Sequence, residues 1–321
     1  MNIQRSGDSK ITIAVSDFHF LKGYDFENFS SRGSSILSDD LEESEIFSAI
    51  DNRALIDDIE KSDRREKKID FSEWKTLGAE TLVKGKILVE ENEIIVELTM
   101  FDVVKGKPIF SKQYRASRKN FRKSIHKFAN EIVYRFTGEK GIALTQIAFL
   151  SRSGKHKEVY LADYDGKGVK RLTNHRSVAL FPSWSPDARS LIFASYKERN
   201  PDLFELDIRS LRSIPVSTTS GLNAPASWAP SGTKLALVQS RFGHSDIFTY
   251  STKTSRYKRL THKRSIETSP AWSPKGRLIA FTSDRSGSPQ VYVMNTDGSD
   301  ERRVTYTGKY NDQAAWSPDG S

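Results

Sequence analysis

The chain has 321 residues, no cysteine, 28% charged residues and a mean hydropathy of −0.56. These values exclude a disulfide framework, a Cys-ligated metal site and thiol catalysis. No apolar run reaches the roughly 18 residues that a membrane-spanning helix needs. A chain of this length predicts two domains.

The net charge of +9 is divided unevenly, because residues 1–140 carry −1 and residues 141–321 carry +10. A basic region attracts nucleic acid, anionic lipid or an acidic protein. The lysines and arginines of the second half are spread through it rather than grouped on one helix face. We therefore expect no nucleic-acid binding, and contact with a membrane only through partner proteins.

Residues 1–138 are predicted to form an α/β domain. Lys10–Phe18 is expected to be a strand, and apolar residues at helical spacing predict a helix over Ser34–Phe47. Asp70 is suited to cap a short helix over 71–77. The further predicted elements are three strands, Thr81–Val89, Glu93–Val103 and Pro108–Tyr114, and a long helix from Phe121 to Phe136 that ends at Gly138.

Residues 139–321 repeat themselves with a period of 44 residues. The period is marked by four tryptophans, Trp184, Trp228, Trp272 and Trp316. Four short apolar runs separated by turn residues lie within one period, and four strands in such a length predict one blade of a β-propeller. In the best-defined unit the predicted strands are Ser269–Ser273, Leu278–Thr282, Gln290–Asn295 and Arg303–Tyr306. The tryptophans and the other repeated apolar residues are expected to pack between neighbouring blades.

The first and last units of the repeat differ from the others. The first unit, from Ile147, has no tryptophan, which predicts a blade without an innermost strand of its own. Trp316 either closes a ring of four blades or begins a further blade. The turn sequence Pro318-Asp319-Gly320 favours the second interpretation, a chain that is part of a longer propeller.

No catalytic residue, metal site or cofactor site is predicted. The sequence has no Gly-x-Ser-x-Gly motif, phosphate-binding loop, dinucleotide fingerprint or His-Glu-x-x-His motif. The segment Asp163-Tyr-Asp165-Gly166 is interpreted as a hairpin turn rather than a calcium loop. The histidines lack ligand spacing and are expected to be surface or turn residues: His19, His126, His156, His175, His244 and His262.

Several motifs together resemble the TolB family of periplasmic propeller proteins of the Tol–Pal system. These are the Trp-Ser-Pro-Asp-Gly blade motif, the strand end Arg171-Leu172-Thr173, the junction Phe136-Thr-Gly-Glu-Lys-Gly141 and the blade segment from Thr282 to Tyr292. The resemblance implies a non-enzymatic adaptor of the cell envelope with a six-bladed propeller, of which this chain supplies about four blades. It also implies a periplasmic location, although the first residues contain no export signal.

The resemblance further implies two partners and a role in outer-membrane integrity and invagination during cell division. Family members bind the lipoprotein Pal at the mouth of the propeller channel and contact TolA with the extreme N-terminus, which corresponds here to Met1–Ser9. Loops that reach the channel precede each repeated tryptophan. The implied Pal-binding residues are Leu180, Leu222, Asn223, Pro225, Thr268 and Asp312. At Leu222 the family often has histidine.

Two other functions are compatible with a propeller. The chain could be the gating propeller of a serine peptidase that resembles the prolyl oligopeptidase group, with its catalytic domain elsewhere. It could also be a sugar- or polyanion-binding propeller that uses its basic charge.

Overall fold

The computed structural model describes residues 10–22, 24–51, 53–66, 68–91 and 93–320. The chain forms two compact units, the first comprising residues 1–146 and 163–167 and the second residues 147–162 and 168–321. The domain boundary between residues 138 and 139 that the sequence suggests remains a prediction. The segment proposed to contact TolA, Met1–Ser9, lies outside the described residues.

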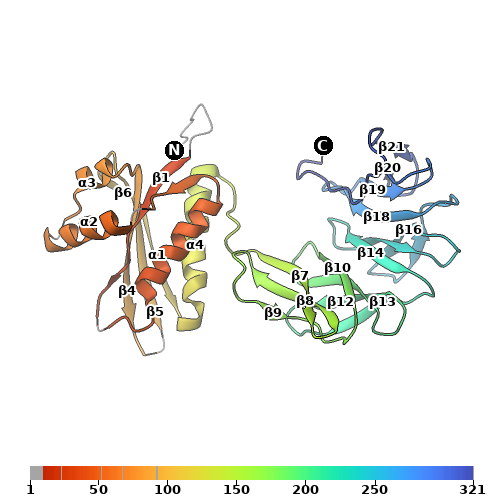
Figure 1. Cartoon of the computed structure of the whole chain (residues 1–321), viewed down its shortest axis with the longest axis horizontal. Helices are drawn as coiled ribbons and strands as arrows, with labels where there is room; N and C mark the ends of the chain where they lie inside the picture. Colours follow the sequence, from red (N-terminus) through yellow and green to blue (C-terminus); the bar gives the residue numbers. More distant parts are fainter. Residues whose placement is uncertain (1–9, 23, 52, 67, 92, 321) are drawn as a thin grey trace. The chain divides into compact units, whose positions relative to one another are not determined.

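The first unit is an α/β domain built on one mixed sheet (Figure 1). The strand order is β3-β1-β4-β5-β6, with β2 paired to β4. Strands β1, β2, β3 and β4 pair in parallel, whereas β4, β5 and β6 form an antiparallel meander. The elements are β1 (Ile11–Val15), β2 (His19–Phe20), α1 (Phe29–Glu43), β3 (Phe47–Ala49), α2 (Arg53–Glu66), α3 (Phe71–Thr76), β4 (Thr81–Val89), β5 (Ile94–Asp102), β6 (Lys107–Ala116), a 3-10 turn η1 (Arg118–Asn120) and α4 (Phe121–Thr137).

Helices cover both faces of this sheet. Helices α1 and α4 pack on one face and α2 and α3 on the other, and each pair shares an apolar core with the strands. Phe18 is buried where α1 approaches β4. A Cβ atom at Gly33 or Gly85 would lie only 2.5 Å from the Phe18 ring, so these two glycines make room for it.

The N-terminal predictions are partly confirmed. Strand β4 has the predicted bounds, and Asp70 caps α3 by accepting a hydrogen bond from the Ser72 backbone N–H. The prediction for Ser34–Phe47 was wrong at both ends. Helix α1 begins at Phe29, where the Asp25 carboxylate accepts two backbone N–H groups at 2.8 Å, and Phe47 belongs to a strand. Helix α2 was not predicted at all.

The expectation that all histidines lie at the surface or in turns was wrong for His126. This residue is 4% exposed, and its Nδ1 forms a hydrogen bond of 2.7 Å with an Asp40 carboxylate oxygen. The Tyr164 hydroxyl donates to the other oxygen of the same carboxylate at 2.6 Å. Tyr164 lies in the predicted hairpin turn after β8, which the structure confirms as a turn. Burial, together with this bond to Asp40, raises the pKa of Tyr164.

The second unit consists of four sheets that follow one another along an arc (Figure 1). Three sheets have four antiparallel strands each and the first has three, as the missing tryptophan predicted. The strands of the first two sheets are β7 (Gln146–Ser153), β8 (His156–Asp163), β9 (Lys170–Arg171), β10 (Ala179–Trp184), β11 (Ser190–Ser195), β12 (Asp202–Asp207) and β13 (Ser213–Ser217). The strands of the last two are β14 (Asn223–Trp228), β15 (Lys234–Gln239), β16 (Asp246–Ser251), β17 (Tyr257–Arg259), β18 (Glu267–Trp272), β19 (Leu278–Ser283), β20 (Gln290–Asn295) and β21 (Arg302–Arg303).

The core of the second unit lies between neighbouring sheets. Three apolar clusters each combine residues of two successive sheets, and each includes one of the repeated tryptophans, Trp184, Trp228 or Trp272. Strand β15 shows the principle: Leu235 and Leu237 pack toward the preceding sheet, whereas Ala236 and Val238 pack toward the following one. The prediction of packing between blades is therefore confirmed.

The arc is open in the described part of the chain. Residues 311–320 form no strand, and the Trp316 indole N–H donates to the Ala271 carbonyl of the preceding sheet at 3.0 Å. Trp316 thus does not close a ring of four blades by pairing with β7.

Candidate partner-binding site

The innermost strand of each complete sheet is irregular at nearly the same place, to within one residue of the 44-residue repeat. Its pairing register shifts between Leu180 and Ser183, between Asn223 and Ala226, and between Thr268 and Ala271. At equivalent repeat positions Phe181, Ser269 and Gln313 adopt left-handed backbone angles, with φ of 54°, 52° and 55°. This conformation costs a non-glycine residue about 1–2 kcal/mol. Bulges and strained residues of this kind redirect side chains, and they cluster at functional sites.

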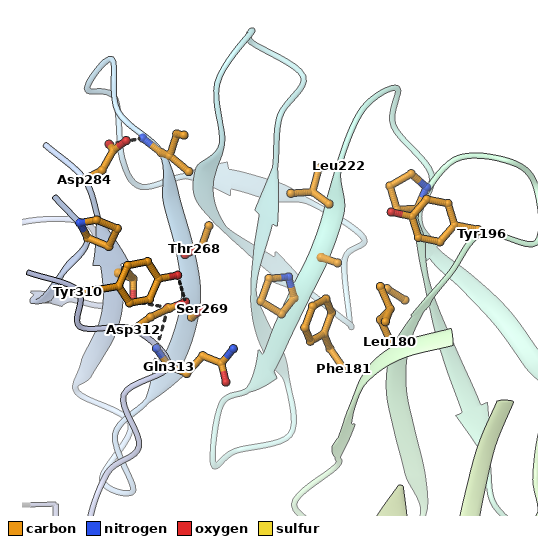
Figure 2. Close-up of a pocket in the computed structure, with 17 residues that line it drawn as sticks. Leu180, Phe181, Tyr196, Leu222, Thr268, Ser269, Asp284, Tyr310, Asp312 and Gln313 are labelled. Carbon is orange, nitrogen blue, oxygen red and sulfur yellow. Dashed lines mark hydrogen bonds between the residues drawn. The ribbon is translucent and has the colours of Figure 1, made fainter. Parts of the chain in front are cut away.

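These bulges border a cavity of about 450 Å³ within the second unit. The cavity is lined by residues of the last three sheets and by the segment 310–313. Figure 2 shows the side chains that surround it, among them Leu180, Phe181, Tyr196, Leu222, Thr268, Ser269, Asp284, Tyr310, Asp312 and Gln313.

The cavity has two chemically different sides (Figure 2). Leu180, Phe181 and Leu222 form an apolar side together with Tyr196, a residue that is 40% exposed. The facing side presents hydroxyl, amide and carboxylate groups, including those of Ser269, Asp284 and Asp312. An apolar surface next to a few fixed polar groups suits the binding of another molecule.

Asp312 is the most firmly positioned carboxylate of the cavity. The Thr282 hydroxyl donates to it at 2.7 Å, as does the Gln313 backbone N–H. Burial alone would raise the pKa of Asp312, but hydrogen bonds from Thr282, Ser269 and neighbouring groups hold this pKa below its usual range. Asp312 is therefore ionised at neutral pH.

The structure brings together five of the six side chains named from the sequence. Leu180, Leu222, Pro225, Thr268 and Asp312 all line the cavity. Asn223 instead is fully buried, and its side-chain amide bonds to Asp202, to Ser217 and to the loop of residues 219–221. Asn223 thus holds the loop that presents Leu222.

Several lining residues were not predicted, chiefly Phe181, Tyr196, Ser269, Tyr310 and Gln313. Phe181, Ser269 and Gln313 share a left-handed backbone, and no glycine at these positions signals it. Their repeat position, three residues before each tryptophan, was the available signal.

The described part of the chain has neither a side-chain grouping that could hold a metal ion nor a helix that could cross a membrane. Among the described residues there is no cluster of three or more histidine, aspartate or glutamate side chains that could hold a metal ion. No described helix is both long enough and apolar enough to cross a membrane.

An α/β domain followed by an arc of 44-residue, four-stranded sheets defines a β-propeller protein with a separate N-terminal domain. Residues 133–321 match the family model of the TolB beta propeller domain, and residues 1–109 match that of the TolB amino-terminal domain. The chain therefore belongs to the TolB family of the Tol–Pal system. This family is non-enzymatic, which argues against the peptidase alternative.

Curated relatives agree with this assignment. The Tol-Pal system protein TolB of Syntrophotalea carbinolica is 35% identical over 192 residues, which are 60% of this chain and 45% of the relative. That of Desulfosudis oleivorans is 34% identical over 219 residues, 68% of this chain and 50% of the relative. The chain thus spans about half the length of the curated relatives it matches.

A solved structure supports the fold. The crystal structure of TolB from Acinetobacter baumannii superposes with a TM-score of 0.81 at 24% identity, and the match covers 99% of this chain and 77% of that one.

Proposed function

We propose that this chain is a non-enzymatic periplasmic adaptor that binds the lipoprotein Pal in the cavity of the second unit. Through this contact it supports outer-membrane integrity and invagination during cell division. The observation that carries the proposal is the cavity itself, because five residues that the family resemblance assigns to Pal binding converge there. Contact with TolA through Met1–Ser9 belongs to the same proposal.

The chemistry of the cavity fits a protein ligand. Its apolar side removes the surface of a partner's apolar side chain from water, which favours binding by about 25 cal/mol for each Å² buried. Its polar side offers directional hydrogen bonds from groups such as Ser269 and Asp312, which fix the orientation of the bound segment.

The substitution Thr268→Glu tests the proposal. It introduces a carboxylate beside Asp312 and fills part of the cavity, so we expect binding of the soluble domain of Pal to weaken at least about tenfold. Affinity is measured by titration calorimetry and the melting temperature by circular dichroism. Thr268 is only partly buried, and we expect the melting temperature to change by no more than about 2 °C.

The matched control is Thr254→Glu. Thr254 is exposed in the turn between β16 and β17, at the opposite end of its sheet from Leu222. This variant adds the same charge and should bind Pal as the wild type does. Equal Pal affinity for the wild type and Thr268→Glu would contradict the proposal.

A further inference from the structure

The loop between β15 and β16 begins at the edge of the cavity. Ser240 is bonded to the cavity residue Leu222 in both directions: its backbone N–H donates to the Leu222 carbonyl at 3.1 Å, and its hydroxyl accepts the Leu222 N–H at 2.8 Å. The next residue is Arg241, which is exposed. Arg241 does not itself line the cavity, but its exposed side chain follows directly on a residue bonded to the cavity residue Leu222.

Three aromatic rings surround this guanidinium. Its central carbon lies 5.0 Å from the ring centroid of Phe242, 4.6 Å from that of Phe248 and 5.9 Å from that of Tyr257. Phe248 is buried and Phe242 is 52% exposed. Cation–π contacts hold an arginine side chain in place without neutralising its charge.

The next repeat shows what is missing around Arg241. Arg285 occupies the equivalent position 44 residues later and pairs with two carboxylates, those of Glu267 and Glu301. The positions 44 residues before these two acids hold Asn223 and Tyr257. Both neutralising groups are thus replaced by uncharged ones. Among the described residues, the Arg241 side chain forms no ion pair and no hydrogen bond.

The other charges nearby do not compensate Arg241. The Asp246 carboxylate is fully buried and lies 2.7 Å from the guanidinium of Arg259, which neutralises it. His244 approaches the same carboxylate at 3.6 Å. Among the described residues of this cluster, Arg241 is therefore the guanidinium that has no carboxylate partner.

We propose that Arg241, supported by Phe242, binds a carboxylate in an acidic segment of a protein that occupies the cavity. This inference rests on the proposed function, because it adds a charged contact beside the apolar one. An arginine already positioned by aromatic rings loses little side-chain entropy when it pairs with a carboxylate. The uncompensated charge also attracts the acidic segment from a distance.

The deciding experiment uses a fluorescently labelled poly-glutamate peptide, with a poly-lysine peptide of equal length for comparison. Binding to the whole chain is followed by fluorescence anisotropy at low ionic strength, where surface charges are little screened. We expect the glutamate peptide to bind more tightly than the lysine peptide. Arg241→Gln should weaken its binding by about fivefold or more.

Arg256→Gln is the matched control. Arg256 is exposed in the same sheet, in the turn between β16 and β17, so the variant has the same net charge as Arg241→Gln. Binding of the glutamate peptide to this variant should stay close to that of the wild type. If both variants weaken binding equally, the effect is one of net charge alone and the inference is overturned.

Two further arms separate the possible sources of the anion and the two proposals. The first arm measures binding of phosphatidylglycerol vesicles. If Arg241→Gln weakens vesicle binding but leaves binding of the glutamate peptide unchanged, the inference is overturned in favour of a lipid surface. A titration with the soluble domain of Pal is made in parallel. If the wild type does not bind Pal, the proposed function is contradicted. Binding of the glutamate peptide that depends on Arg241 would still support the acidic-segment site in that case.

Discussion

His175 is a half-buried histidine whose surroundings predict that the second unit is sensitive to acid. Its Nδ1 lies 2.9 Å from the Ser195 hydroxyl, and its ring centroid lies 5.2 Å from that of Phe204. Burial lowers the pKa of His175, and the positive charge of Lys197 lowers it further. The unfolded chain therefore takes up a proton on this residue at a higher pH than the folded protein does.

This difference in pKa predicts a pH dependence of stability. The stabilisation from neutral His175 is present above the unfolded pKa of about 6.5 and is lost as pH falls through the lower folded value. We expect the melting temperature to fall between pH 7 and pH 5, and this fall to be smaller by about 1–3 °C in His175→Gln. Thermal unfolding followed by circular dichroism at both pH values measures this, and identical falls in the two proteins would rule the explanation out.

Only part of the environment of Asp312 could be predicted from the sequence. The sequence located Asp312 near the cavity through its repeat position. Its bonds to Thr282 and Ser269, which keep it ionised, depend on the bulged backbone. Side-chain partners across strands follow from register, and register shifts are not visible in a pattern of apolar residues.

Among the elements, the turns between the two inner strands of each sheet offer a direct comparison. Ala188 has φ of 55°, whereas the three later repeats have glycine at this position, with φ between 67° and 78° at Gly232, Gly276 and Gly320. A left-handed backbone costs alanine about 1–2 kcal/mol more than glycine. Glycine loses about 0.5–1 kcal/mol of this advantage through the greater entropy of its unfolded chain.

We therefore expect Ala188→Gly to stabilise the protein by about 0.5–1 kcal/mol, measured as the free energy of unfolding in urea. The reverse change, Gly232→Ala, should destabilise it by a similar amount. A Cβ atom at Gly232 would meet nothing closer than the Pro186 ring at 4.0 Å, so its effect comes from the backbone alone. A destabilised Ala188→Gly would show that turn strain is not what separates the repeats.

The elements could be predicted where the local pattern and the tertiary context agree. Strand β20 has the predicted bounds because Gln290–Asn295 is apolar, short and enclosed by turn residues. Helix α2 was missed because it is highly charged, with Ile56 as its sole fully buried apolar residue among those described. Its position depends on packing against Trp74 and the sheet, which a local pattern does not report.

For the whole molecule, the two units have separate apolar cores. The clusters of the first unit contain residues of the α/β domain and Tyr164, whereas Leu237 belongs to a cluster formed by two successive sheets of the second unit. Stability within such an array is a sum of contacts between nearest neighbours. Local damage should therefore be felt mainly within the unit that contains it.

The variant Leu237→Ala tests this separation. Leu237 is fully buried, so we expect a loss of about 2–5 kcal/mol in the second unit. Hydrogen-exchange mass spectrometry should show faster exchange in residues 168–320 and unchanged exchange in residues 10–146. A comparable acceleration in both ranges would show that the units unfold together.

The alternation of side chains along β15 also limits how this chain can change in evolution. Leu237 and Val238 serve different neighbours, so inserting or deleting one residue within the strand would exchange the two faces and misplace every side chain that follows. Substitutions of similar size are tolerated far better in such a position. We therefore expect insertions and deletions to be confined to the turns, and strands of this kind to diverge by substitution.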